Sequence, residues 1–261
     1  MTADLDPRPL AYPRAIEKAS ASTDSGPRFA AAGPSSFRRQ QFSVYKRPSA
    51  HTLVAMLYVG LTGNIASGKS EAANRFAERG ATIVDADVLA RQAVAVGSPA
   101  FERVVDRWGK EILAPDGTLD REALRHTVFA DPAQLEELNA IVHPGVNKLR
   151  RKMVAEARKR GDPVLIYVVP LLFERRLAGE FDQIILVDAP QELRLRRLVE
   201  LRGVSPEDAA NTISAQMPAE LKRARTNFVI ENDGSLDHLD EQVNEIWTRL
   251  TASGARSSLA V

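Results

Sequence analysis

A glycine-rich segment of the chain has residue types and spacing that suit phosphate binding. It satisfies the pattern G-x-x-x-x-G-K-[ST] with Gly63, Asn64, Ile65, Ala66, Ser67, Gly68, Lys69 and Ser70. In such a loop, backbone N–H groups and the positive end of the following helix hold the β-phosphate of a nucleotide. Lys69 reaches the β- and γ-phosphates, and the hydroxyl of Ser70 ligates Mg²⁺. The amide of Glu71 can reach the α-phosphate. This P-loop, residues 63–70, therefore predicts a nucleotide site.

The residues on both sides of the P-loop support this interpretation. Residues 57–62 form a short apolar run typical of a strand, and Ala72, Ala73 and Phe76 follow with helical spacing. A glycine-rich turn carrying a surface lysine is the simpler alternative, which the flanking strand and helix disfavour. The motif does not reveal where the γ-phosphate goes, because GTPases, motors and kinases share this fold.

Two carboxylates follow the second predicted strand. Residues 81–85 are a β-prone run that ends at Asp85, and Asp87 comes two positions later. In a doubly wound sheet, ligands bind at the carboxyl ends of the strands. One aspartate could contact Mg²⁺ through water, while the other accepts a proton from a hydroxyl acceptor. Capping of the next helix is the alternative reading of both residues.

Five ordered blocks of the sequence together resemble the dephospho-CoA kinase family. They are residues 60–70, Asp85-Ala86-Asp87 with Arg91, His143-Pro144, residues 170–174 and Gln216-Met217-Pro218. The resemblance spans about residues 56–250. It implies transfer of the γ-phosphate of ATP to the ribose 3′-hydroxyl of dephospho-CoA, giving coenzyme A and ADP with Mg²⁺. This reaction is the last step of coenzyme A biosynthesis.

The resemblance also implies roles for individual residues. Asp87 matches the family's catalytic base, and Asp85 is the expected contact to Mg²⁺ through water. Arg91, His143 and Glu174 match blocks that border dephospho-CoA. A local hydrogen bond is the alternative role for His143, and orientation of a neighbouring side chain is the alternative for Glu174.

A basic helix is expected to close over ATP. The helical pattern from Glu192 to Arg202 lies in the segment of residues about 190–225 that resembles the family's lid, and a closed lid excludes water. The family usually has an arginine four residues after the one matched by Arg197. This chain has Leu201 there, followed by Arg202. Arg197 and Arg202 are therefore both candidates for stabilising the transferring phosphoryl group.

Three positions of the nucleotide site depart from the family pattern. Asn64 and Ala66 stand where glycines are common, and the P-loop accepts both side chains if their φ angles are negative. Glu71 replaces the usual threonine. Because its expected contact is made by the backbone N–H group, this substitution should be tolerated.

The order of the patterns predicts an α/β architecture. Five apolar runs with helices between them indicate a three-layer P-loop kinase fold with a five-stranded parallel sheet. A helical insertion at about residues 88–160 resembles the family's acceptor-binding region, and the whole domain is expected over residues 56–252. We expect residues 253–261 to form a frayed tail.

Residues 1–55 differ from the rest of the chain in composition. They contain 8 basic and 4 acidic residues, a net charge of +4, and 6 of the 15 prolines. Their apolar residues are too scattered to form a helix or strand, so we expect disorder. An organellar transit peptide is one alternative, which the acidic residues disfavour. Translation from Met56 is another.

The composition excludes several kinds of site. The 261 residues include 35 Lys and Arg, 34 Asp and Glu, and no cysteine. The net charge of +1 gives no bias toward nucleic acid or membranes, and disulfides, thiolate zinc sites and cysteine nucleophiles are impossible. Apolar runs are too short to span a bilayer, and without a secretory pattern a cytoplasmic location is expected. The oligomeric state is left open.

Two other P-loop functions are weighed against this one. Another small-molecule or nucleoside kinase would share the ATP chemistry and differ in its acceptor. A GTP-binding switch requires Asn-Lys-x-Asp, but the pair Asn147-Lys148 is followed by Leu149 and Arg150. A nucleic-acid role of the basic N-terminal segment is a third alternative, which would show salt-dependent binding.

Overall fold

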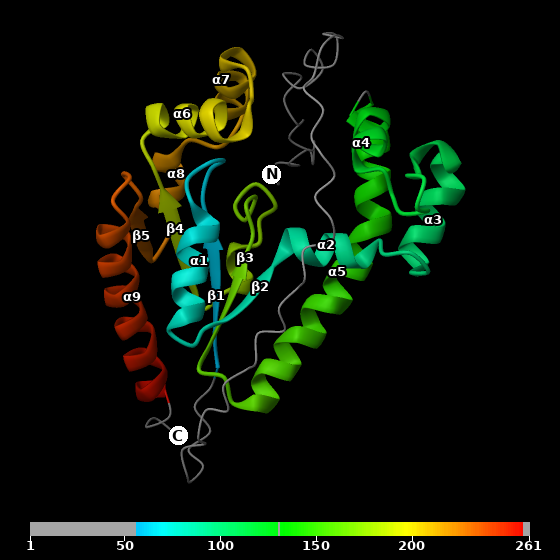
Figure 1. Cartoon of the computed structure of the whole chain (residues 1–261). Helices are drawn as coiled ribbons and strands as arrows, with labels where there is room; N and C mark the ends of the chain where they lie inside the picture. Colours follow the sequence, from blue (N-terminus) through cyan, green and yellow to red (C-terminus); the bar gives the residue numbers. More distant parts are fainter. Residues whose placement is uncertain (1–55, 130, 258–261) are drawn as a thin grey trace, which may run out of the picture.

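A five-stranded parallel sheet forms the centre of the molecule (Figure 1). The computed structural model describes residues 56–129 and 131–257. The strands within them are β1 (Leu57–Thr62), β2 (Thr82–Asp85), β3 (Val164–Val168), β4 (Gln183–Asp188) and β5 (Phe228–Glu231), in the order β2-β3-β1-β4-β5. The prediction of a five-stranded parallel sheet is confirmed. The central place of β1 puts the P-loop at the middle of the sheet's carboxyl edge.

The central strands are buried on both faces, as parallel strands between helices must be. All residues of β3 are buried, and the sequence of this strand is continuously apolar. Gly60 of β1 is required by close packing, because a Cβ atom there would lie 2.7 Å from Leu172 Cδ1 and 3.0 Å from the ring of Phe181. A side chain at position 60 would push this covering segment off the sheet.

Helices connect the strands and cover both faces of the sheet. They are α1 (Lys69–Glu78), α2 (Ala86–Ala93), α3 (Pro99–Trp108), α4 (Arg121–Phe129), α5 (Pro132–Arg160), α6 (Gln191–Arg202), α7 (Pro206–Ser214), α8 (Ala219–Arg223) and α9 (Leu236–Ser257). Two short 3₁₀ turns are η2 (Lys110–Ile112) and η3 (Ala178–Glu180). Within the described residues, none of these helices is long and apolar enough to cross a bilayer.

Two hydrophobic clusters on opposite faces of the sheet create the three layers. On one face, Val59 and Leu61 of β1 pack with Phe76 of α1 and Val243 of α9. On the other, residues of β3 such as Leu165 pack against the second half of α5 (Figure 1). Alternate residues of each strand point to opposite faces, so one strand serves both clusters.

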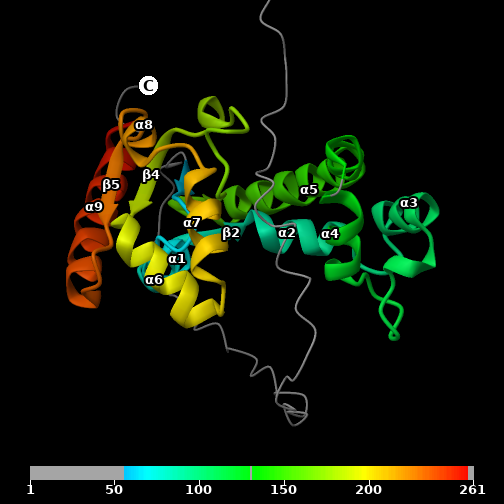
Figure 2. The ribbon, with the colours of Figure 1, turned by 90° about the horizontal axis from the view of Figure 1, so that it is seen from above.

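The helices α2 to α5 lie between β2 and β3, where the sequence predicts a helical insertion. They project to one side of the sheet (Figure 2). Their own core contains Val104, Ile112, Leu124, Val128 and Ile141. The long helix α5 joins the two parts, because its first half contributes to this core and its second half covers the sheet.

The lid segment, residues 190–225, forms α6, α7 and α8 above the carboxyl edge of the sheet (Figure 1). Leu198, Ala209 and Ile213 make a small cluster, and Ile65 and Ala66 of the P-loop pack against it. The lid segment is therefore in contact with the P-loop in this structure.

The prediction for the C-terminal tail can be compared with the structure in part, whereas the prediction for residues 1–55 cannot. The extension 1–55 lies outside the described residues, as do residues 258–261. Helix α9 continues to Ser257. Residues 253–257 are therefore helical, where the sequence pattern indicated a frayed tail.

Candidate active site

The P-loop lies between β1 and α1, and two of its glycines are required by close contacts. Gly63 has φ +157°, and a Cβ atom on it would lie 2.2 Å from the carbonyl oxygen of Val187. Gly68 has φ +91°, and its Cβ atom would lie 2.0 Å from Asn232 Nδ2. That amide donates a hydrogen bond of 2.7 Å to the carbonyl oxygen of Ser67. The loop after β5 thus fixes the P-loop where α1 begins, and the positive end of α1 faces the loop.

Ala66 does not have the negative φ that the sequence analysis required for this position. Its φ is +57°, in the left-handed region, whereas Asn64 is outside that region. For an L-residue this conformation costs about 1 kcal/mol. Ala66 is held there because it packs against the α6–α7 cluster and its carbonyl oxygen accepts a hydrogen bond of 3.2 Å from Arg197 Nη1. Contacts made by the lid segment therefore override the preference of Ala66 for a negative φ.

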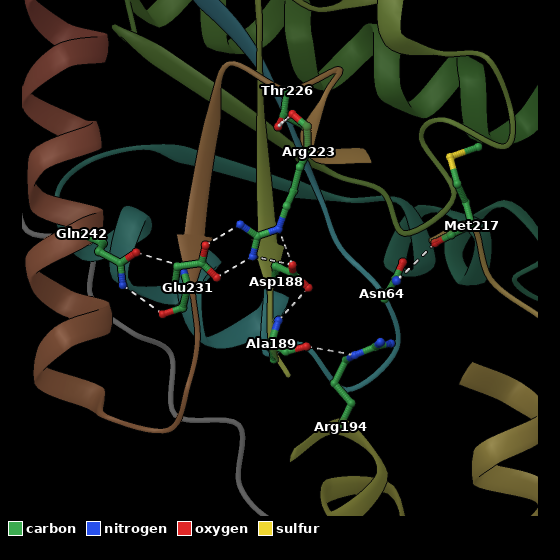
Figure 3. A network of polar contacts seen from close by, with 9 residues as sticks. All are labelled: Asn64, Asp188, Ala189, Arg194, Met217, Arg223, Thr226, Glu231 and Gln242. Atoms are coloured by element: carbon green, nitrogen blue, oxygen red, sulfur yellow. Dashed lines mark hydrogen bonds and ion pairs between the residues drawn. The ribbon is translucent and has the colours of Figure 1, made fainter. Parts of the chain in front are cut away.

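The lid segment also binds the P-loop through the Gln216-Met217-Pro218 block. The backbone N–H of Ile65 donates to Gln216 Oε1 at 2.8 Å. Asn64 Nδ2 donates to the carbonyl oxygen of Met217 at 3.3 Å (Figure 3). The block that carried part of the family resemblance thus has a visible task, which is to fix the first half of the P-loop.

Lys69 is folded back onto its own loop. Its ammonium donates hydrogen bonds to the carbonyl oxygens of Gly63 at 2.8 Å and Asn64 at 2.9 Å. Burial, followed by the charges of Lys222 and Arg202, lowers the pKa of Lys69 to about 8. The ammonium is still mainly charged at pH 7. Both acceptors of its hydrogen bonds in this structure are neutral backbone carbonyls.

The two aspartates after β2 have different surroundings. Asp85 caps α2, since its Oδ1 accepts from the N–H groups of Asp87 at 2.7 Å and Val88 at 3.2 Å. The capping alternative is thus confirmed for Asp85, and its Oδ2 remains available. Asp87 is exposed in the first turn of α2, and its carboxylate has no hydrogen bond or ion pair to the described residues. Arg91 Nε contacts only the carbonyl oxygen of Asp87, at 3.2 Å. Both carboxylates lie near enough to Lys69 to favour its charged form.

The oxygen groups at this edge suit Mg²⁺. Ser70 presents an exposed hydroxyl from the first turn of α1, and Asp85 has the Oδ2 atom that capping leaves over. In the described part of the chain, His, Cys, Asp and Glu side chains do not gather in groups of three or more that could hold a metal ion. Mg²⁺ is commonly held by one or two protein oxygens together with phosphates and water, so the donors fit.

The two candidate arginines of α6 occupy different places. Arg197 binds the carbonyl oxygen of Ala66, whereas Arg202 is exposed at the end of the helix and its charge acts on Lys69. Leu201, at the position where the family usually has arginine, is 77% exposed. Arg194 is buried and donates to the carbonyl oxygen of Ala189 (Figure 3), so it fastens α6 to the end of β4.

His143 lies inside α5 and faces the segment that follows β3. Its Nε2 is 2.7 Å from Arg175 Nη1. Burial and the charge of Arg175 lower the pKa of His143, which favours the neutral ring as a hydrogen-bond acceptor. A cavity of about 490 Å³ runs along α5 and is lined by Ala140, His143, Pro144, Asn147, Arg150 and Arg151. His143 therefore has a hydrogen-bond partner and also borders open space.

Glu174 forms an ion pair with a lysine that the sequence analysis missed. Its Oε1 lies 2.8 Å from Lys222 Nζ, and the Lys222 side chain is completely buried. Lys222 belongs to α8, one turn after Pro218. The only sequence signal for it is this closeness to the Gln216-Met217-Pro218 block.

A second polar network fastens α8 to the ends of β4 and β5 (Figure 3). Arg223 Nη1 and Nη2 bind the two carboxylate oxygens of Glu231 at 2.5 and 2.6 Å, and Arg223 Nε donates to Asp188 Oδ2 at 2.7 Å. These bonds raise the pKa of Arg223. Gln242 of α9 pairs with the backbone N–H and carbonyl groups of Glu231. The base of the lid segment is therefore firmly attached to the sheet.

Comparison with known proteins identifies close relatives of this chain. A family model described as dephospho-CoA kinase matches residues 57–238. The chain is 45% identical over 195 residues to a dephospho-CoA kinase of Streptomyces avermitilis, with 75% of this chain and 94% of that protein covered. It is 44% identical over 192 residues to a dephospho-CoA kinase of Geobacter metallireducens, with 74% and 96% covered.

Solved structures agree with these sequence matches. TT1252 from Thermus thermophilus is 37% identical, with a TM-score of 0.65 and coverage of 75% of this chain and 98% of that one. A dephospho-CoA kinase from Campylobacter jejuni shares the fold at 21% identity, with a TM-score of 0.54 and coverage of 76% and 98%.

Proposed function

The chain belongs to the dephospho-CoA kinase family, and from that premise we propose how its residues transfer the γ-phosphate of ATP to the ribose 3′-hydroxyl of dephospho-CoA. This reaction gives coenzyme A and ADP, the last step of coenzyme A biosynthesis. The observation that carries the proposal is that Lys69, in a braced P-loop after β1, and the exposed carboxylate of Asp87, after β2, lie at the same edge of the parallel sheet, near enough for Asp87 to favour the charged form of Lys69. A phosphate donor on one side and a hydroxyl acceptor on the other would meet between them.

On the nucleotide side, the P-loop and the start of α1 hold the phosphates of ATP. The backbone N–H groups of residues 63–71 and the positive end of α1 bind the oxygens, and Lys69 leaves the carbonyls of Gly63 and Asn64 to contact the β- and γ-phosphates. The contacts from Gln216, Met217 and Asn232 keep this cradle in shape before ATP arrives. Little reorganisation is then required at the moment of transfer.

On the acceptor side, Asp87 is the general base. As the 3′-oxygen of dephospho-CoA bonds to the γ-phosphorus, its proton passes to the Asp87 carboxylate. The bond from the γ-phosphorus to the bridging oxygen breaks at the same time, and its electrons remain on ADP. The free and exposed carboxylate of Asp87 is suited to this role, whereas Asp85 already uses one oxygen to cap α2.

Ser70 and Asp85 are the residues that would hold Mg²⁺, the former through its hydroxyl and the latter through water. The ion supplies positive charge that neutralises the phosphate oxygens during transfer. Arg197 and Arg202 add positive charge from the lid segment. Arg202 is free to move toward the phosphates, while Arg197 must first leave the carbonyl oxygen of Ala66.

Arg91, His143 and Glu174 are proposed to border dephospho-CoA. Arg91 follows Asp87 by one helical turn and is exposed, and His143 opens onto the cavity beside α5. For Glu174 the contact with Lys222 supports the alternative task of orienting a neighbour. The proposed partners are small molecules, ATP and dephospho-CoA, with no nucleic acid or membrane, and the proposed location is the cytoplasm.

The test is ADP release by the full chain with MgATP, measured with and without dephospho-CoA. We expect dephospho-CoA to stimulate turnover, and Asp87→Asn to reduce it by about 10²- to 10⁴-fold while ATP binding is retained. Asp106→Asn, which changes an exposed aspartate of α3, is the matched control and should behave like the wild type. ATP binding without stimulation by dephospho-CoA, together with stimulation by a nucleoside or sugar, would refute the acceptor assignment and retain the P-loop assignment.

A further inference from the structure

A strongly basic stretch of α5 has no task in the proposed reaction. Residues 148–160 contain seven basic residues and one acidic residue. A run of this kind most often forms a solvated helix face. In the structure, however, the basic side chains lie on different sides of α5. Arg150, Arg151 and Arg158 line a hollow, whereas Lys152 is exposed outside it. The three arginines are therefore set apart from the rest of the basic stretch.

The hollow, which we call the α5 hollow, lies between α5 and the chain around η3. Its volume is about 500 Å³, within the range of roughly 300–1,000 Å³ that is common for ligand pockets. From α5 it is lined by Arg150, Arg151, Val154, Ala155 and Arg158, and from the other side by Tyr58 and Glu180. The spacing of the α5 residues places them on one face of the helix. The cavity beside His143 shares Arg150 and Arg151 with the α5 hollow, so the two spaces adjoin along this face.

The side of the hollow opposite α5 is fixed to the sheet. The backbone N–H of Tyr58 donates to Asp182 Oδ2 at 2.7 Å, and the Tyr58 carbonyl oxygen accepts from the backbone N–H of Asp182 at 2.9 Å. The rings of Tyr58 and Phe181 pack with their centroids 4.9 Å apart. Within the described residues, the buried Tyr58 hydroxyl makes no hydrogen bond of normal geometry, although the charges of Arg150 and Glu180 act on it. Burial raises the pKa of Tyr58 to about 12, so the hydroxyl stays protonated as a donor.

The α5 hollow carries a net positive charge. Among the described residues, Glu180 is the one acidic residue in its lining, and Arg150 Nη1 binds Glu180 Oε2 at 2.5 Å. The guanidinium of Arg150 also lies 5.5 Å from the centre of the Tyr167 ring, so this arginine is held from two sides. Arg151 and Arg158 are exposed, and neither makes a hydrogen bond or ion pair with the described residues. The hollow therefore combines a fixed positive charge with two guanidinium groups whose donors are unused.

We propose that the α5 hollow is a binding site for the phosphate groups of a small molecule. Arg151 and Arg158 each present a planar pair of donors, which matches two oxygens of a phosphate group. Arg150 adds a charge that is already held in place, and Val154 and Ala155 offer apolar surface to the organic part of the ligand. A walled space of this volume suits a metabolite better than a nucleic-acid strand.

This site is separate from the reacting groups of the proposed function. Tyr58 is the second residue of β1, whereas the P-loop follows the last one. Such phosphate groups have two sources. One is a free phosphorylated metabolite. The other is dephospho-CoA itself, whose own phosphates would reach the hollow from the adjoining cavity beside His143. The second source rests on the proposed function, whereas the phosphate site does not.

The probe is pyrophosphate, titrated calorimetrically into the full chain. All proteins carry Lys69→Met, which weakens the competing P-loop site. In this background, Arg151→Gln combined with Arg158→Gln removes two charges from the hollow. Lys152→Gln combined with Lys159→Gln removes two charges from α5 outside the hollow and is the matched control. Because all four side chains are exposed, both double variants should keep the unfolding midpoint of the background protein.

We expect the arginine double variant to bind pyrophosphate at least about tenfold more weakly than the background protein, and the lysine control to stay within about twofold. Equal affinities of the two double variants would overturn the inference, because general attraction to a basic helix would then explain the binding. The inference would also fail if the background protein did not bind pyrophosphate.

A second titration, with dephospho-CoA in the presence and absence of pyrophosphate, identifies the source. Competition between the two, with weaker binding of dephospho-CoA to the arginine double variant, assigns the site to the phosphates of the acceptor. Independent binding of the two assigns it to another phosphorylated metabolite. Failure of the proposed function looks different, because dephospho-CoA would then not stimulate ADP release by the wild type, while pyrophosphate binding would still depend on Arg151 and Arg158.

Discussion

The nucleotide side and the acceptor side of this site are built in different ways. In the P-loop, Ser67 is buried, Asn64 is held by Met217, and Asn232 bonds the loop from beyond β5. Across the site, Asp87 is exposed, and its carboxylate has no hydrogen bond or ion pair to the described residues. The half proposed to bind the phosphates is organised in advance, whereas the half proposed to receive the acceptor offers the exposed side chains of Asp87 and Arg91 on α2. Preorganisation is most useful where charge develops during the reaction.

The largest effect should come from the P-loop lysine. Lys69→Met removes the side chain that is proposed to contact the β- and γ-phosphates and should reduce kcat/KM by about 10²- to 10³-fold. Lys110→Met, an exposed lysine of η2, is the matched control. The measurement is steady-state ADP release. A loss of less than about threefold in kcat/KM would show that the nucleotide side does not depend on Lys69. It would contradict the proposed difference between the nucleotide side and the acceptor side.

Asn232→Ala tests whether the braces of the P-loop matter. It removes the bond to Ser67 and leaves a buried carbonyl without that partner, which should destabilise the fold by about 1–3 kcal/mol. The affinity for ATP should fall about tenfold because the loop loses its fixed shape. Denaturant unfolding and calorimetric titration with ATP measure the two effects, with Asn244→Ala on the exposed face of α9 as control. Unchanged ATP affinity would mean that the P-loop keeps its shape without this contact.

Acidification should weaken the acceptor side first. The folded protein lowers the pKa of His143, so the unfolded chain binds a proton more readily than the folded chain. The contribution of His143 is therefore complete above pH 6.5, the ordinary value, and is lost as the pH falls below it. The unfolding midpoint should decrease between pH 7 and 5 by more in the wild type than in His143→Gln. Identical pH profiles of the two proteins would refute this.

The smallest effect is expected from Ala66→Gly. Glycine removes the left-handed strain of about 1 kcal/mol at φ +57° but adds freedom to the unfolded chain, and the two effects nearly cancel. The free energy of unfolding should change by less than about 1 kcal/mol, with ATP binding retained. Denaturant titration measures the change. A larger loss of stability would show that the Ala66 methyl group, packed on the α6–α7 cluster, contributes more than its strain costs.

Short-range sequence patterns were sufficient to predict most of the fold. The five strands were predicted because each is a compact apolar run, and the P-loop because its spacing is fixed by backbone geometry. The end of α9 was misplaced because a helix that is supported by packing can continue beyond the last apolar residue of its pattern.

The candidate site was predicted only where a motif carried the information. Asp85 was identified, but its capping bond to Asp87 could be offered only as an alternative, since one aspartate can do either task. Lys222 and Asn232 were missed, because lysine and asparagine usually lie on the surface and nothing local marks these two as buried.

The order of elements, the phosphate-binding pattern and the family can be predicted from sequence alone, since each depends on residues that are close together or on ordered blocks. The tertiary structure decided which distant side chains meet. It placed Gln216 and Asn232 on the P-loop, buried Lys222 against Glu174, and forced Ala66 into a positive φ. These features arise from contacts between residues up to 165 positions apart in the sequence. A local sequence pattern does not show which distant residues meet in the fold.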